Sequence, residues 1–348
     1  MGSTYFKDLG KRYGNRFWIN NPTVDEMEKA INVGAIACTT NPAFCSRLAK
    51  VGKDGLRATI LAVLEKEPDI ERAAPLVYAE SCRPLLSRFR ALYDSSGGKE
   101  GFVTIQDDPR RDADAAATMK AVEAYRRLGP NFMAKIPVVP GGIEAIEACV
   151  AENVPICATE IFAVSQAMEV CEVYEAASAK TGKRPPFYVT HISGIFDDYL
   201  RILATRRKSA VSSEALATAG ILVARKQYRL MQKKFPGAIL LGGGARNASH
   251  FTGLAGGEVD VTINWSTAED LMKADCIPEA ALNDAPDTAT VAALEAAFTD
   301  FTAAWNERGL PRGGFAEYGP VQLFRNQFLE GWYALLSEIA SVKREHAL

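Results

Sequence analysis

Short apolar segments alternate with amphipathic segments along nearly the whole chain. The apolar segments are rich in Val, Ile and Phe or are continuously apolar, which is typical of parallel strands covered on both faces. They predict strands over residues 16–20, 34–39, 102–106, 132–138, 154–161, 187–192, 238–242 and 259–264.

Residues with helical spacing of apolar positions fill the intervals between these strands. Thr23 is expected to cap a helix over 24–32, because Glu26 follows three residues later and completes a capping box. Further helices are predicted over 56–66, 143–152, 165–179 and 213–234. Two long helices, 288–305 and 321–343, follow the last strand and are joined by the Gly/Pro-rich segment GLPRGGFAEYGP.

Eight strands that alternate with helices predict a closed (β/α)8 barrel, a TIM barrel of the α/β class. A doubly wound open sheet is the alternative, and it would carry a nucleotide-binding fingerprint after a strand. The glycine cluster LGGGARN does not have the spacing G-x-G-x-x-G. Since no linker or internal repeat interrupts the pattern, residues 1–348 are expected to form one barrel domain, with helices 288–343 packed on it.

The composition narrows the class of protein. With 48% hydrophobic residues the 348-residue chain can bury a large core, which excludes a disordered protein. Its 40 basic and 42 acidic residues give a net charge of −2, so nucleic acid is not expected as a partner. No apolar run approaches the roughly 20 residues that span a membrane, and the first residues lack targeting character, so a cytoplasmic protein is expected.

Cysteine and histidine are too few and too scattered for a metal or disulfide framework. The seven cysteines include no Cys-x-x-Cys pair, and the chain has three histidines. The cysteines are therefore interpreted as small core residues in a reducing compartment, and no metal or other cofactor is expected.

Polar residues stand where each predicted strand ends, which is where a barrel enzyme builds its active site. Strands often end in polar turn residues, and for a single asparagine that explanation suffices. As a set, however, these residues predict a ring around one pocket: Asn20, Asn41, Gln106, Lys135, Thr159, Thr190, Arg246 and Asn264.

Lys135 is unusual because it lies within the apolar segment NFMAKIPVVP. Lysine is almost never buried without a partner or a function. Burial disfavours the ammonium form and lowers its pKa, and a neutral amine can attack a ketone to form a Schiff base. The alternative is a lysine paired with a carboxylate across the barrel.

At this point the sequence resembles the transaldolase family of class I aldolases. The resemblance rests on CTTNPAF at 38–44, on MAKIPVVPGG and CATEIFAVSQA within 133–167, on YVTHISGIFDD at 188–198 and on GGGARN at 242–247. It implies a (β/α)8 barrel in which Lys135 forms a Schiff base with a ketose donor.

The same resemblance suggests roles for other residues of these blocks. Asn41, with Thr39 beside it, would bind the donor hydroxyls, and Thr190 would line the pocket. Thr159 would position the catalytic water, and Arg246 would hold the terminal anion of the substrate.

The sequence departs from the family pattern at the acid/base positions. Transaldolases carry an aspartate at the end of strand one and a glutamate on strand three, where this chain has Asn20 and Gln106. An amide can hydrogen-bond a water but cannot take its proton. Fructose-6-phosphate aldolase, a close relative, also has glutamine on strand three and orders the water with a tyrosine, where this chain has Phe162.

The acid/base group is therefore left unassigned by the sequence. Glu160 and His191 are candidates, but strict alternation would point them away from the lumen if Thr159 and Thr190 point inward. The Asp107-Asp108 pair is expected to start a helix instead.

The anion site also departs from the pattern. Transaldolases hold the substrate phosphate with two arginines and a serine; Arg246 matches one arginine, while Ile195 and Gly244 stand at the other two positions. Loss of one charge-assisted contact costs on the order of 1.5–3 kcal/mol. The substrate tail is therefore predicted to differ from an ordinary sugar phosphate.

The sequence thus predicts an enzyme that transfers a dihydroxyacetone unit between a ketose and an aldehyde, or releases it. The family's frequent dimers suggest a homodimer, with Trp332 and Tyr333 available for either packing or association. The alternative function is a non-catalytic sugar-binding or regulatory barrel that has lost its acid/base groups.

Overall fold

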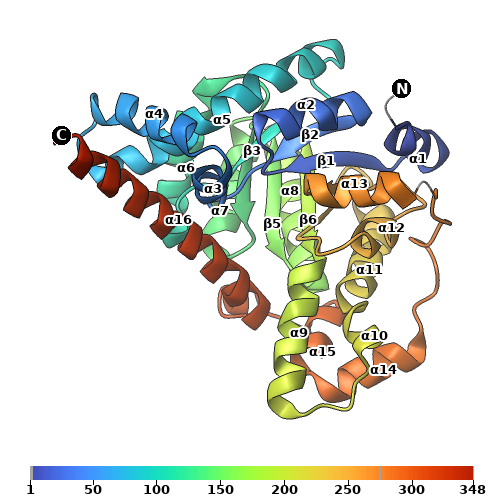
Figure 1. Cartoon of the computed structure of the whole chain (residues 1–348). Coiled ribbons are helices and arrows are strands. Elements are labelled where there is room, and N and C mark those ends of the chain that lie inside the picture. The colour runs from blue at the N-terminus through green and yellow to red at the C-terminus, as the bar shows by residue number, and fades with distance from the viewer. Residues whose placement is uncertain (1–2, 275, 348) are drawn as a thin grey trace.

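A closed barrel of parallel strands forms the centre of the molecule (Figure 1). The computed structural model describes residues 3–274 and 276–347, and within them eight strands pair in chain order, with β8 returning to β1. The strands are β1 Arg16–Asn20, β2 Ala35–Thr39, β3 Val103–Ile105, β4 Phe132–Pro137, β5 Ile156–Ile161, β6 Phe187–Ile192, β7 Ile239–Gly243 and β8 Asp260–Ile263. The predicted (β/α)8 barrel is confirmed.

Helices cover the outside of this barrel. Those between successive strands include α2 Val24–Val33, α6 Ala115–Tyr125, α7 Pro140–Ala151, α8 Val164–Thr181, α9 Ser193–Arg207 and α11 Ala219–Lys234, and α13 Trp265–Ala274 follows β8. Additional helices are α1 Tyr5–Tyr13, α3 Phe44–Val51, α4 Lys53–Leu64, α5 Ile70–Ser95, α10 Ser213–Leu216 and α12 Ser249–Thr252, and short 3₁₀ turns are η1 Pro109–Arg111, η2 Arg126–Leu128 and η3 Arg312–Gly314. The predicted capping box at the start of α2 is present, since Thr23 and Glu26 bond each other's backbone N–H.

Two of the predicted helices are wrong, because the structure has two shorter helices in place of each. Residues 213–234 form α10 and α11, because a carboxylate from α9 caps the second helix: Asp197 Oδ1 accepts from the Gly220 N–H at 2.8 Å. Residues 288–305 form α14 Thr288–Ala297 and α15 Thr299–Trp305. The division falls at Phe298, whose backbone is extended (φ −135°, ψ 108°) and whose side chain is buried.

An aromatic and apolar layer fills the lower half of the barrel. Its members come from successive strands: Trp18, Ala37, Phe102, Met133, Cys157, Tyr188 and Leu241. Since side chains alternate along a strand, the residues two positions later face the same lumen nearer its mouth. This register directs Asn20, Thr39, Lys135, Thr159 and Thr190 toward the C-terminal end of the barrel.

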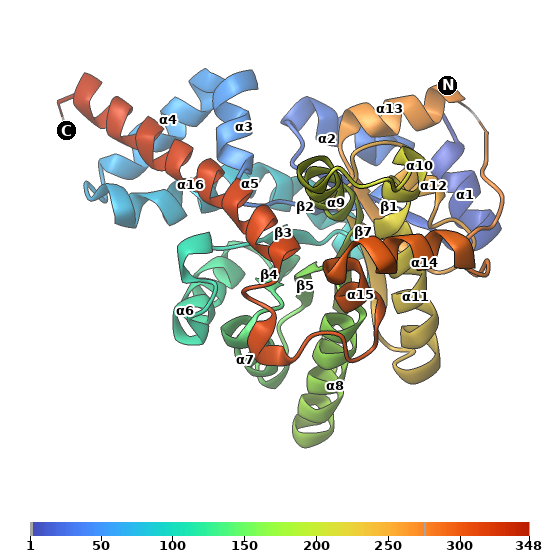
Figure 2. The same cartoon turned by 90° about the horizontal axis from the view of Figure 1, so that it is seen from below.

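The last helix, α16 Gly319–Glu345, begins beside the strand ends and extends from there past α3 and α4 (Figure 2). It contacts α3, α4, α5 and α9 as well as β5 and η1, and thus joins distant parts of the chain over the strand ends. Trp332 is buried with its ring edge-on to Tyr78, whereas Tyr333 is 54% exposed. Trp332 therefore serves packing, and Tyr333 remains at the surface.

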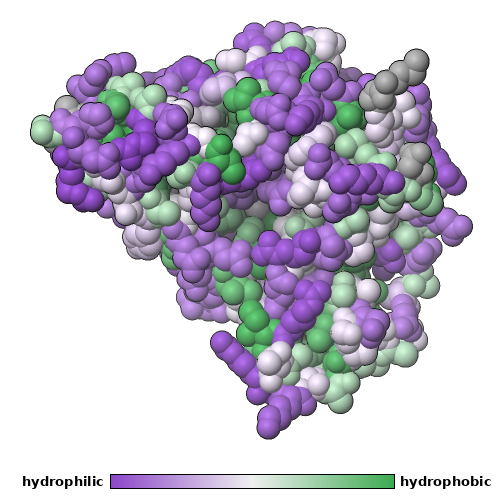
Figure 3. Space-filling model, in the orientation of Figure 1, coloured by the Kyte–Doolittle hydropathy of each residue, from purple (hydrophilic) through white to green (hydrophobic). Residues whose placement is uncertain are grey.

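The face seen in Figure 1 is mostly hydrophilic, with hydrophobic residues in small separate patches (Figure 3). Such scattered patches are ordinary for a protein surface. In the part of the chain that the structure describes, no helix combines the length and the apolar character needed to cross a membrane. The homodimer and the cytoplasmic location stay predictions.

Close packing of α16 at Gly331 gives a stability prediction. A Cβ at this position would lie 2.7 Å from Ala43 Cα, although alanine is otherwise preferred to glycine inside a helix by about 1 kcal/mol. G331A should therefore lower the free energy of unfolding by about 1–3 kcal/mol through overpacking, as measured by urea denaturation. G313A is the matched control, because a Cβ there meets nothing within 4 Å among the described residues. A stabilised G331A protein would contradict this packing.

Candidate active site

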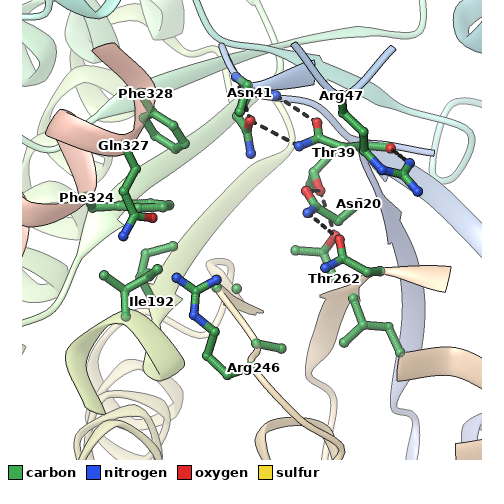
Figure 4. Close-up of a pocket in the computed structure, with 18 of the residues that line it drawn as sticks. Asn20, Thr39, Asn41, Arg47, Ile192, Arg246, Thr262, Phe324, Gln327 and Phe328 are labelled. Carbon is green, nitrogen blue, oxygen red and sulfur yellow. Dashed lines mark hydrogen bonds between the residues drawn. The ribbon is translucent and has the colours of Figure 1, made fainter. Parts of the chain in front are cut away.

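A cavity of about 520 Å³ opens at the C-terminal ends of the strands (Figure 4). Strand-end residues form one side of it, and Phe324, Gln327 and Phe328 of α16 form the other. Of the predicted site residues, the lining includes Asn20, Thr39, Asn41, Lys135, Thr190, Arg246 and Asn264. The structure therefore brings together seven predicted residues from six of the eight strand ends.

Hydrogen bonds between side chains fix the wall formed by β1, β2 and β8. Thr39 Oγ1 lies 3.0 Å from Asn20 Oδ1, to which it can donate, and 2.6 Å from Thr262 Oγ1. Asn20 Nδ2 donates in turn to Asn264 Oδ1 at 2.9 Å. This wall presents amide and hydroxyl groups in defined orientations, which suits the hydroxyl groups of a carbohydrate.

Asn41 is held just beyond the end of β2. Its Oδ1 accepts from Asn21 Nδ2 and from the backbone N–H of Ala43, both at 3.0 Å. With the carbonyl oxygen occupied, the Nδ2 group remains as the donor that Asn41 can offer to a ligand.

Lys135 reaches this cavity from β4 with little exposure of its side chain, since the residue is 7% exposed. Its Nζ donates to the Thr40 carbonyl at 3.3 Å and lies 5.6 Å from the centre of the Phe328 ring. A carboxylate bonded to Nζ, the alternative raised by the sequence, is not found among the described residues. Burial lowers the pKa of Lys135, against the opposing effects of Cys157 and Glu160.

Three other predicted residues lie deeper than the cavity wall. Gln106, Thr159 and Phe162 are almost completely buried. The ring of Phe162 lies edge-on behind Phe324, at 6.1 Å between ring centres, so that it supports the wall of the cavity. The proposed roles of Gln106 and Thr159 stay predictions, and both residues lie on strands next to β4.

The end of β5 departs from strict alternation. Its pairing with β6 shifts between Ala158 and Ile161, and Glu160 adopts a left-handed backbone with φ 59°. The Glu160 side chain consequently accepts a 3.0 Å hydrogen bond from Gln106 Nε2 on the β3 side. The expectation from alternation does not hold for Glu160, because the bulge redirects its carboxylate.

The electrostatic surroundings distinguish Glu160 from the other acid/base candidates. Burial raises the pKa of Glu160 to about 7, although Gln106, Lys135 and Arg325 act in the opposite direction. Burial lowers the pKa of His191 to about 3, so its imidazole is neutral near pH 7.

The adjacent aspartates are engaged elsewhere. Asp108 caps η1 and bonds Arg110, which confirms the prediction that it starts a helical turn. Asp107 accepts from the Tyr125 hydroxyl at 2.8 Å. Neither aspartate belongs to the cavity lining given by the described residues.

Arg246 is the cation at the β7 side of the cavity. Its guanidinium extends toward Gln327 (Figure 4), while its Nε donates to Asp198 Oδ2 at 2.7 Å. Ile195 and Gly244 line the same region and contribute no charge. Asp198 thus partly offsets the charge of Arg246, while its other oxygen accepts from Arg201 at 2.7 Å.

Sequence reasoning missed the contributions of α16 and Asp198. Phe324, Gln327 and Phe328 lie nearly 200 residues beyond Lys135, and helical spacing predicts only that such residues face a core. Asp198 stood inside the quoted block YVTHISGIFDD, but its sequence position alone does not reveal the partner of Arg246.

The site is thus a desolvated lysine at the mouth of a parallel (β/α)8 barrel, surrounded by amides and hydroxyls. Comparison with known proteins gives the family of this barrel. Residues 17–309 match the family model described as Transaldolase/Fructose-6-phosphate aldolase, and the chain belongs to this family.

Individual relatives are distant. The chain is 25% identical over 266 residues to Transaldolase 1 of Streptomyces coelicolor, covering 73% of this chain and 64% of the relative. It is 29% identical over 217 residues to the transaldolase of Mycobacterium ulcerans, covering 58% and 56%, respectively. The matched regions thus span less than two thirds of these relatives.

The raised pKa of Glu160 predicts a pH-dependent stability. Because its ordinary value is 4.5 and its folded value is about 7, the unfolded chain loses this proton first. The stabilising contribution is complete below about pH 4.5 and is lost as the pH rises through about 7. The free energy of unfolding of the wild type, minus that of E160Q, should therefore decrease from pH 5 to pH 8 in urea titrations.

E147Q on the exposed face of α7 provides the matched control for this comparison. If E160Q and E147Q show the same difference from the wild type at both pH values, the raised pKa of Glu160 is refuted.

Proposed function

We propose that this protein is a transaldolase-like class I aldolase that acts through a Schiff base at Lys135. The donor is a ketose, and the reaction transfers a dihydroxyacetone unit to an aldehyde or releases it. The observation that carries the proposal is the Lys135 amine, buried at the barrel mouth and bonded to a backbone carbonyl rather than to an acid.

The chemistry follows from the surroundings of this amine. In its neutral form Lys135 attacks the ketose carbonyl at C2, and the resulting iminium accepts the electrons of the C3–C4 bond as that bond breaks. The C4 hydroxyl gives its proton to a base, and the aldehyde leaves. Apolar neighbours such as Phe328 exclude water, which keeps the amine unprotonated and protects the carbanion. Asn41 and the Asn20–Thr39 pair offer hydrogen bonds for the hydroxyl groups of the donor.

The substrate tail is proposed to differ from a sugar phosphate. A phosphate at Arg246 would compete with Asp198, which already bonds the guanidinium. Ile195 and Gly244 supply no additional cation. A neutral hydroxyl tail, or an anion weaker in charge than phosphate, fits this balance better.

A non-catalytic sugar-binding barrel is the competing function. Burying an amine costs stability and gives a binding protein no advantage, and the cavity retains this amine. Measured turnover separates the two: binding of ketoses without cleavage or exchange would favour the binding protein.

Borohydride trapping tests the Schiff base directly. Incubation with dihydroxyacetone and sodium borohydride should add the reduced donor to the peptide that contains Lys135, as detected by mass spectrometry. Dihydroxyacetone has no tail, so the result is independent of the anion site. K135M should give no adduct.

K226M is the matched control for this trapping. Burial also lowers the pKa of Lys226, but its Nζ lies over the Trp305 ring, outside the barrel mouth. The adduct should therefore persist in K226M, and labelling of a peptide other than that of Lys135 would overturn the mechanism.

The Asp198–Arg246 pair predicts a change in specificity. D198N should release Arg246 and lower KM for fructose 6-phosphate relative to fructose by a few-fold, up to about tenfold, because this half-exposed pair is worth up to about 1 kcal/mol. R201Q removes the other partner of Asp198 and leaves Arg246 paired, so it should produce no such gain. An unchanged KM ratio in D198N would argue against neutralisation of the tail site.

A further inference from the structure

Buried polar atoms without partners gather beside Lys135. Gln106 Oε1, Thr159 Oγ1 and Glu160 Oε2 each lack a hydrogen-bond partner within residues 3–274 and 276–347. Thr159 and Glu160 are consecutive, and Glu160 Oε1 is 3.0 Å from Gln106 Nε2. Ile105 pairs with Ala134, so Gln106 comes opposite Lys135, Thr159 pairs with Pro137 two residues further along β4, and the charge of Glu160 acts on Lys135.

A buried carboxylate oxygen without a hydrogen-bond partner lowers the stability of the fold. Its presence beside the site therefore points to a function. The left-handed backbone of Glu160 also costs free energy, because a non-glycine residue rarely adopts φ 59°. Regular alternation would have placed this side chain away from Gln106. The bulge therefore brings a proton-carrying group to Gln106, which itself supplies only an amide.

We propose that Glu160 exchanges protons with the ketose bound to Lys135, through the water that Thr159 positions. This inference rests on the proposed Schiff-base function and identifies the acid/base group that the function requires. Gln106 orients the carboxylate by donating its amide hydrogen, and Glu160 Oε2 remains for the water.

The proton balance of this step is complete. Addition of neutral Lys135 to the ketose carbonyl gives a carbinolamine with a hydroxyl on C2. The acid form of Glu160 donates a proton through the bridging water to that hydroxyl, the C2–O bond breaks, and water leaves together with formation of the iminium. On hydrolysis the Glu160 carboxylate takes back one proton as water adds to C2.

The charges that face Glu160 allow both protonation states near neutral pH. Lys135 on β4 and Arg325 on α16 favour its carboxylate, and Asp112 after η1 is a neighbouring acid whose own pKa is raised by burial and by Glu160. Arg325 also lies 3.7 Å from Asp112. With burial dominant, the pKa of Glu160 is about 7, which suits a group that must donate and accept in turn.

The test measures how fast the adduct with dihydroxyacetone forms, by quenching with borohydride at successive times between pH 5.5 and 8.5. E160Q, which is isosteric, should slow adduct formation on Lys135 by about a hundredfold or more. It should also lose the change of slope near pH 7 that the wild type shows. E160D should recover part of the rate and the pH dependence, and it serves also if E160Q fails to fold.

E147Q on the exposed face of α7 is the control, because it removes a carboxylate outside the buried cluster and leaves Glu160 and its neighbours in place. It should retain the rate and the slope change near pH 7. A wild-type rate with unchanged pH dependence in E160Q, or loss of the slope change in E147Q, would overturn the role of Glu160. Absence of any adduct in the wild type would instead refute the proposed function itself.

Discussion

Exclusion of water from one amine is the constraint on which the site depends. The Lys135 side chain crosses the upper lumen of a barrel whose lower half is filled by rings and alkyl groups, and Phe328 of α16 lies beside its amine. An ammonium ion in that position has a carbonyl and an aromatic face as neighbours, which compensate poorly for lost hydration. The neutral form of the Lys135 amine is favoured because the surrounding fold keeps water away from it.

The same enclosure explains the polar network around the amine. Asn20, Thr39 and Thr262 are linked by hydrogen bonds across three strands, so these three side chains are oriented before a ligand arrives. A ligand that replaces solvent at their remaining donors binds to groups that are already oriented. Gln106 and Glu160 extend this arrangement below the cavity, where a carboxylate rather than an amide holds the exchangeable proton.

The sequence predicted the barrel well, because burial on both faces leaves a strong apolar signal in parallel strands. It also placed Lys135, Asn41 and Arg246 at one mouth, since strand ends of a closed barrel must converge. The spacing of apolar residues predicted the helix boundaries less well where a side chain from another helix caps the helix. Asp197 caps α11 from α9 and divides a segment that helical spacing reads as continuous.

The orientation of Glu160 could not be derived from the sequence for a related reason. Strict alternation fails when a single residue adopts a left-handed conformation. Glutamate has no conformational preference that would predict this conformation. The pairing of Asp198 with Arg246 likewise depends on how α9 and the loop after β7 approach each other. Side-chain partners across such gaps are set by tertiary packing, which periodicity does not encode.

The position of α16 at the end of the fold has a consequence for biosynthesis. A ribosome delivers Lys135 long before it delivers Phe324 and Phe328, so the nascent barrel exposes this amine to solvent. The enclosure that lowers the pKa of Lys135 is therefore complete only after α16 has been synthesised and has packed beside the strand ends.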